Sequence, residues 1–182
     1  MALLKIAVSS DDHQLGSDSA PVTLVEYGDY QCPYCAAAAP VVRNLRKRFG
    51  DQLRFIFRNF PLSEMHPHPA KAAQVAEFAE ENGKFWQMHD LLFANQRRFD
   101  DPLFFELAEQ LDLSTFDLRE ALALGLHKRR VQADLEGGLI SGVRGTPTFF
   151  INSRRHDAPN DERSLGAEIN EILARNFRRQ GV

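Results

Sequence analysis

Dense apolar runs and helically spaced apolar residues alternate in the first part of the chain. Residues 22–27 (VTLVEY) are rich in β-branched and apolar residues, as is typical of a buried strand. Over residues 33–49 apolar side chains recur at helical intervals, which predicts a helix that ends near Gly50. Residues 53–57 (LRFIF) predict a second strand. A strand, a helix and a strand in this order form a βαβ unit, so the two strands should run parallel.

From residue 64 to residue 142 the apolar residues recur at helical intervals, and no strand signal is found. One helix is expected over residues 69–82, and residues 103–111 place apolar side chains along one helical face. Ser114 suits the N-cap of a further helix, because Asp117 stands at the capping-box position. Strand composition returns at residues 148–151, and one last helix is expected beyond them. That helix carries its apolar residues on one stripe: Leu165, Ile169, Ile172, Leu173 and Phe177.

These patterns divide the chain into three parts and predict an α/β fold. Residues 1–20 are expected to be an irregular lead-in, because turn-forming residues dominate their second half. Residues 21–63 and 143–178 carry the strand signals and form one domain with the order βαβ…ββα. Residues 64–142 form an all-helical domain inserted between the two halves.

Composition limits the class of protein and its partners. The 182 residues are 43% hydrophobic, enough for a sizeable core, while 26% are charged and the net charge is −3. The chain is therefore not disordered, and it has no basic excess to hold a nucleic acid. The apolar start of the chain is interrupted by Lys5 and lacks the ~7–15 apolar residues of a secretory signal. No stretch approaches the ~18 apolar residues of a membrane span. We expect a cytoplasmic monomer with no membrane partner; a chain whose signal was removed is the alternative.

Two cysteines, Cys32 and Cys35, stand three positions apart at the predicted helix start. A Cys-x-x-C motif between a strand and a helix is typical of a redox dithiol. Cys32 should lie at the N-cap, where free backbone N–H groups stabilise a thiolate and lower its pKa. Cys35 lies one turn further on, less exposed, and can resolve a mixed disulfide. Pro33 suits the first turn of the helix.

Two other interpretations of the cysteines are possible from the sequence: buried structural thiols, or half of a zinc site with His66 and His68. Zinc-binding histidines usually stand three to five residues apart, whereas these two stand in a stiff His-Pro-His-Pro run whose side chains diverge. We therefore expect no metal, and no cofactor other than the redox-active Cys32–Cys35 disulfide.

Glu26 is a carboxylate in the middle of a predicted buried strand. It shares the face of Val22 and Leu24, because strand side chains alternate. Burial should raise its pKa, and such a group could take the proton of Cys35 and return it. Pairing with a lysine or arginine is the structural alternative.

The strand with Glu26, the Cys-Pro-Tyr-Cys motif, the helical insertion and the segment VRGTPTFFIN together resemble the DsbA family of thiol:disulfide oxidoreductases, in its soluble bacterial branch. The resemblance covers about residues 12–177. It implies a thioredoxin fold with a helical domain inserted, with Cys32 as the nucleophile and Cys35 as the resolving thiol. Thr146 and Pro147 match the cis-proline loop that binds a substrate strand, and Glu26 matches the buried acidic position.

The dipeptide between the cysteines tunes the redox potential in this family. Its strong oxidants carry Pro-His, whereas this chain has Pro33 and Tyr34, and a tyrosine adds no positive charge beside the thiolate. We expect reductase-like exchange with protein thiols and disulfides, with glutathione or a thioredoxin-type protein as reductant. Two alternatives stay open. One is a glutathione-linked reductase or transferase that uses Arg58, Lys71 or Arg144, and the other is a redox-regulated module that binds an extended peptide.

Overall fold

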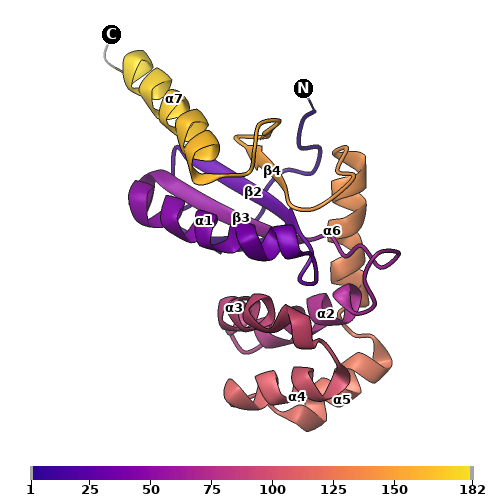
Figure 1. Ribbon diagram of the computed structural model, residues 1–182. Coiled ribbons are helices and arrows are strands. Elements are labelled where there is room, and N and C mark those ends of the chain that lie inside the picture. The colour runs from indigo at the N-terminus through magenta and orange to yellow at the C-terminus, as the bar shows by residue number, and fades with distance from the viewer. Residues whose placement is uncertain (1, 181–182) are drawn as a thin grey trace.

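A five-stranded sheet forms the centre of the computed structural model, which describes residues 2–180 (Figure 1). The strand order is β1-β3-β2-β4-β5. Strands β2 (Val22–Gly28) and β3 (Leu53–Asn59) run parallel and are joined by α1 (Pro33–Phe49). The predicted βαβ unit is therefore confirmed.

Antiparallel strands flank this parallel pair on both sides. Strand β4 (Thr148–Ile151) pairs with β2 and, on its other edge, with β5 (Arg154–Arg155). Asn152 and Ser153 connect β4 to β5 with φ angles of 44° and 70°, the left-handed backbone that a tight turn uses. On the far side of the sheet, β1 (His13–Leu15) pairs with β3.

Every helix except α1 and the last one lies between β3 and β4 in the chain. These helices are α2 (Pro69–Glu80), α3 (Phe85–Asn95), α4 (Asp101–Gln110), α5 (Thr115–Leu124) and α6 (Lys128–Ile140). A short 3₁₀ turn, η2 (Gln96–Arg98), follows α3, and another, η1 (Gly50–Gln52), joins α1 to β3. Helices α2 to α5 form a layer beside the sheet domain (Figure 1). The α/β fold class with a helical insertion is confirmed.

Side-chain alternation along β2 separates two apolar clusters, one on each face of the sheet. Leu24 belongs to the cluster beneath α1, which continues into the inserted helices. Val25 and Tyr27 belong to the smaller cluster beneath α6, together with Phe60. Because Glu26 follows the parity of Leu24, its carboxyl lies on the α1 face, which is the side of the cysteines.

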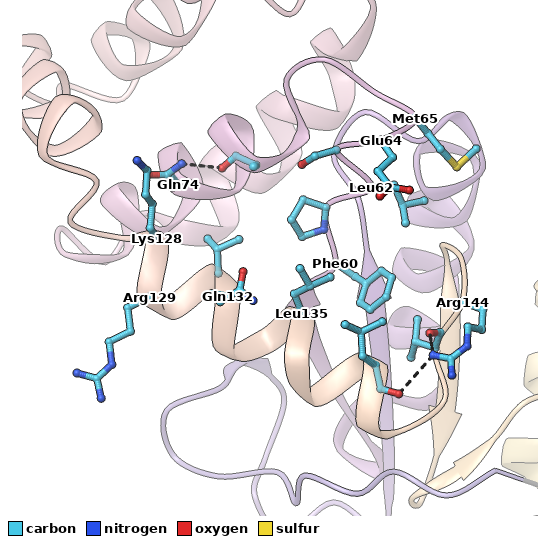
Figure 2. Close-up of a pocket in the computed structure, with 16 residues that line it drawn as sticks. Phe60, Leu62, Glu64, Met65, Gln74, Lys128, Arg129, Gln132, Leu135 and Arg144 are labelled. Carbon is cyan, nitrogen blue, oxygen red and sulfur yellow. Dashed lines mark hydrogen bonds between the residues drawn. The ribbon is translucent and has the colours of Figure 1, made fainter.

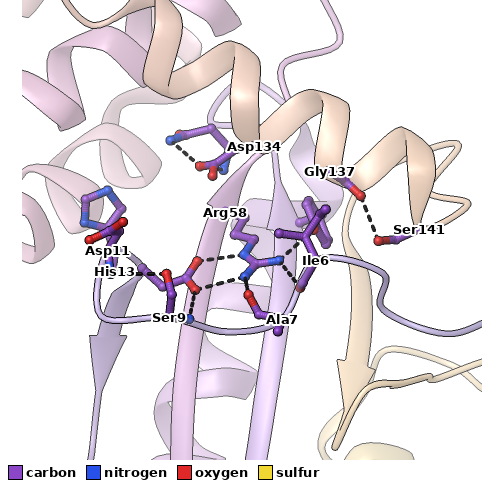
Figure 3. A network of polar contacts seen from close by, with 12 residues as sticks. Ile6, Ala7, Ser9, Asp11, His13, Arg58, Asp134, Gly137 and Ser141 are labelled. Atoms are coloured by element: carbon purple, nitrogen blue, oxygen red, sulfur yellow. Dashed lines mark hydrogen bonds and ion pairs between the residues drawn. The ribbon is translucent and has the colours of Figure 1, made fainter.

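The prediction that residues 1–20 are irregular is wrong for β1. Polar side chains hold this segment, so it lacks the apolar alternation that marks a strand in sequence. The guanidinium of Arg58 donates to both carboxylate oxygens of Asp12, at 2.7 and 2.9 Å (Figure 3). The ring Nε2 of His13 lies 2.9 Å from Oε1 of Glu77. Both partners are distant in the sequence, so local pattern could not reveal them.

Helix α7 (Glu162–Gln180) packs on α1 through its first half and then extends beyond the sheet (Figure 1). Leu165 and Ile169 are fully buried, as the apolar stripe predicts, but Phe177 is 80% exposed. The stripe prediction is therefore wrong at Phe177. None of the helices within residues 2–180 combines the length and the apolar character needed to cross a membrane.

Candidate active site

The dithiol stands where the chain leaves β2 and enters α1. Cys32 is the N-cap of α1 and Pro33 its first residue. The N–H groups of Cys35 and Ala36 donate to the carbonyl of Cys32 at 3.1 and 3.2 Å, so they close the first turn. Both cysteines are free thiols, and Cys35 is fully buried. The predicted positions of the two cysteines on the helix are confirmed by this geometry.

The two sulfurs have pKa values shifted in opposite directions. The Cys35 thiol, which donates to the sulfur of Cys32, is the main reason why the pKa of Cys32 falls to about 5. The hydroxyl of Thr146 and the backbone N–H groups of Cys35 and Tyr34 act in the same sense, while burial opposes them. Burial raises the pKa of Cys35 well above its ordinary value. Near neutral pH, Cys32 is therefore the thiolate and is prepared to attack, whereas Cys35 keeps its proton.

Glu26 lies beneath the dithiol, fully buried, and its Oε1 has no hydrogen-bond partner among the described residues. Burial, and then the negative charge of Cys32, raise the pKa of Glu26 to about 8. No ion pair to Glu26 occurs in residues 2–180, so the structural alternative of a paired carboxylate does not apply there. A small cavity of about 70 Å³, roomy enough for water, reaches from Glu26 past His89 to exposed Arg43. Glu26 is placed to exchange a proton with water that enters this cavity.

The Thr146–Pro147 peptide bond is cis, and the loop that contains it lies against the dithiol. The Cys32 thiol lies 3.4 Å from the Thr146 carbonyl, as donor to acceptor. The amide of Asn160 donates to the Pro147 carbonyl at 3.1 Å and holds the loop from its other side. A cavity of about 340 Å³ opens beside this loop. Tyr34, between the two cysteines, is 74% exposed.

Asp29 organises the turn before the dithiol, and sequence reasoning missed it. Its N–H donates to the Cys35 sulfur at 3.4 Å. Its carboxylate accepts from the N–H groups of Gln31 and Leu62, at 2.7 and 2.9 Å, and pairs with His66 at 2.9 Å. An aspartate three residues before a Cys-x-x-C motif was the available signal. This contact accounts for the orientation of His66.

Gln96, in η2 of the inserted helices, also reaches the active-site turn. Its amide donates to the carbonyls of Tyr30 and Cys32, both at 3.1 Å. No sequence signal marks it, because its partners are more than sixty residues away. His89 is a core histidine, as expected: it is buried, its Nδ1 lies 3.1 Å from the Tyr30 hydroxyl, and burial lowers its pKa to about 3.

The cations expected for a glutathione site are not equally free. Arg58 is buried and binds Asp12, and Lys71 pairs with Asp101 at 2.8 Å. Arg144 is exposed, and its guanidinium donates to the carbonyl of Val143 at 3.1 Å. Of these three cations, Arg144 is therefore the one that is open to a ligand.

A family model described as thioredoxin matches residues 9–171. The chain belongs to the thioredoxin family. BdbD from Bacillus subtilis superposes with a TM-score of 0.84 and 25% sequence identity, over 95% of this chain and 98% of that chain. Alpha-DsbA1 from Wolbachia pipientis superposes with a TM-score of 0.82 and 18% identity, over 95% and 96%. The resemblance to the DsbA branch of the thioredoxin family is confirmed at the level of fold. This family, this fold and the adjacent thiols support thiol:disulfide oxidoreductase chemistry at the site.

Curated relatives of this thioredoxin-family chain are longer proteins. Na(+)/H(+) antiporter NhaA 1 of Salinispora arenicola is 42% identical over 94% of this chain and 26% of its own length. Na(+)/H(+) antiporter NhaA of Herminiimonas arsenicoxydans is 36% identical over 94% and 27%. The chain thus spans about a quarter of the length of the curated relatives it matches.

Proposed function

We propose that the protein exchanges its Cys32–Cys35 pair with protein disulfides through a mixed disulfide at Cys32. The observation that carries the proposal is the placement of two free thiols in one helical turn, with Cys32 at the N-cap and Cys35 fully buried, which shifts their pKa values in opposite directions. The Cys32 thiolate attacks a client disulfide, a Cys32–client bond forms, and one client sulfur leaves as a thiolate. Cys35 loses its proton and attacks Cys32, which releases the second client thiolate. Two electrons pass to the client, and the Cys32–Cys35 disulfide remains.

Glu26 accepts the proton of Cys35 in this scheme. A carboxyl with a pKa of about 8 is mostly protonated at neutral pH but keeps an ionised fraction, so it can both take and return a proton. The cavity beside Glu26 gives that proton a route to solvent. The Glu26 side chain thus supports resolution of the mixed disulfide and not its formation.

The direction we propose is reductase-like, in a reducing cytoplasmic compartment, with glutathione or a thioredoxin-type protein as electron donor and no metal or other cofactor. The pKa of Cys32, about 5, lies between the values of ~7 for thioredoxin and ~3.5 for DsbA. A less stabilised thiolate means a less oxidising disulfide. The part shared with the antiporter relatives is a thioredoxin-family domain, so we propose no ion transport for this chain.

Two measurements test this proposal. Insulin reduction, followed as turbidity with dithiothreitol as final reductant, should require both Cys32 and Cys35. Equilibration with glutathione should give a potential between about −270 and −180 mV. A potential near −120 mV would overturn the reductase direction. Turnover of glutathione mixed disulfides that survives Cys35→Ser, without insulin reduction, would assign the protein to the glutathione-linked class.

A further inference from the structure

A cavity of about 870 Å³ lies between α6 and the loop that follows β3, and neither cysteine lines it (Figure 2). Apolar side chains face it from both walls: Phe60, Leu62 and Met65 from the loop, and Leu135 and Leu139 from α6. We call this cavity the α6 groove. Its volume and apolar walls are those of a ligand site. Met65 is 73% exposed, and a flexible thioether at such a position adapts to varied side chains.

Unpaired cations stand at both ends of the α6 groove. Lys128 and Arg129 lie at the start of α6, and Arg144 lies at the opposite end (Figure 2). All three are exposed, and within residues 2–180 none forms an ion pair with a carboxylate. Glu64 is the one acidic residue in the lining. The charge of the groove is therefore complementary to an apolar ligand that carries carboxylates.

One end of the α6 groove adjoins the dithiol. Arg144 stands two residues before Thr146, whose carbonyl contacts Cys32. Leu62, on the facing wall, is held by Asp29, which also contacts the Cys35 sulfur. A polypeptide bound at Cys32 can therefore continue directly into the groove.

The length of the groove suits an extended peptide segment. From Lys128 to Leu139, α6 rises about 16 Å at ~1.5 Å per residue. An extended chain covers this distance with about five residues at ~3.3 Å each.

We propose that the α6 groove binds the segment flanking the reactive cysteine of a protein client, and that it selects extended segments with apolar and acidic side chains. This inference rests on the proposed disulfide exchange and names the class of client. Apolar side chains enter between α6 and the loop, and client carboxylates meet Lys128 or Arg144, while Arg129 adds positive charge at the start of α6.

The test uses mixed disulfides formed by the Cys35→Ser protein in a glutathione buffer, quantified by mass spectrometry. Each probe peptide has one cysteine and a flanking segment of about five residues. The segments contain leucine with glutamate, leucine with glutamine, leucine with lysine, or serine with glutamate. The amounts give an equilibrium constant for exchange of each peptide with the protein. This constant is divided by the equilibrium constant for exchange of the same peptide with glutathione alone, which removes effects of charge on the peptide thiol. We expect the leucine–glutamate peptide to exceed the leucine–glutamine peptide about fivefold, and the leucine–lysine peptide to be weakest.

A matched pair of charge reversals separates the groove from the overall charge. Arg129 and Arg163 are exposed second residues of α6 and α7, where a glutamate also suits the helix dipole. We expect Arg129→Glu to weaken the preference for glutamate and Arg163→Glu to leave it intact. Equal effects of the two reversals would overturn the inference.

The remaining outcomes are also decisive. If all peptides join Cys32 equally well, the inference fails while disulfide exchange stands. If no peptide joins Cys32, the proposed function fails and the inference falls with it. A dimer in sedimentation that Arg129→Glu disrupts, without any peptide preference, would assign the groove to a second copy of the chain and overturn the inference.

Discussion

At the scale of single residues, two sulfurs lie in one helical turn, with Cys32 at the N-cap and Cys35 fully buried. Their pKa values differ because hydrogen bonds, chiefly from the Cys35 thiol, stabilise the Cys32 thiolate, whereas burial keeps the proton on Cys35. The sequence predicts both positions, since the Cys-x-x-C spacing and Pro33 determine where the helix begins. It also predicts the buried Glu26, because strand parity is local. Asp29 and Gln96 escape prediction, because their partners come from distant loops.

Removing the Cys35 thiol should raise the pKa of Cys32. The hydrogen bond from Cys35 is the main cause of the low value of about 5, so Cys35→Ala should move the pKa toward the ordinary ~8.5. Cys35→Ser keeps a hydroxyl donor and should raise the pKa less. The pH dependence of iodoacetamide alkylation measures it. The same midpoint in all three proteins would contradict the assigned cause.

Replacing Glu26 should change how stability depends on pH. The pKa of Glu26 is about 8 when folded and ~4.3 when unfolded, so the folded state holds the extra proton between these values. The stabilising effect of this proton is full below about pH 4 and is lost as pH rises to 8. The low pKa of Cys32 has the opposite effect over about pH 5–8.5.

In Glu26→Gln the contribution of the Glu26 proton to the pH dependence of stability is absent. The free energy of unfolding of the reduced variant, relative to the reduced wild type, should therefore increase from pH 5 to pH 8, by as much as several kcal/mol. Denaturant unfolding at several pH values measures this difference, in which the Cys32 contribution largely cancels. A difference that does not change with pH would contradict a buried, protonated Glu26. Slower resolution of a Cys32 mixed disulfide should accompany the change.

At the scale of elements, η2 of the helical insertion holds the turn between β2 and α1. The Gln96 amide binds two carbonyls of that turn, so Gln96→Ala should loosen it and alter the alkylation rate of Cys32. The cost in stability should be about 1 kcal/mol.

Asn95→Ala is the matched control for this prediction. The Asn95 amide donates to the carbonyl of Leu91 within its own helix, at 2.9 Å, and among residues 2–180 it has no other hydrogen-bond partner. Thermal unfolding should show comparable losses for the two variants, whereas Cys32 reactivity should change only in Gln96→Ala. Equal reactivity in both would show that the insertion does not position the dithiol.

At the scale of the whole molecule, periodicity predicts the sheet, the parallel pair and the inserted helices, because each signal lies within one segment. Strand β1 escapes prediction because side chains 46 and 64 residues away hold its neighbourhood. The prediction for the end of α7 fails for a different reason: the apolar stripe of the helix continues to Phe177, but the sheet beneath it ends earlier. The α6 groove appears only when the loop after β3 meets α6, so no single segment encodes it.

Trapping the mixed disulfide tests disulfide exchange through Cys32 most directly. The Cys35→Ser protein, mixed with a peptide containing a disulfide, should form a one-to-one adduct whose bond mass spectrometry maps to Cys32. Cys32→Ser should form none near neutral pH, because the remaining Cys35 is buried and protonated. An adduct at Cys35, or no adduct in either variant, would contradict the assignment of Cys32 as the attacking sulfur.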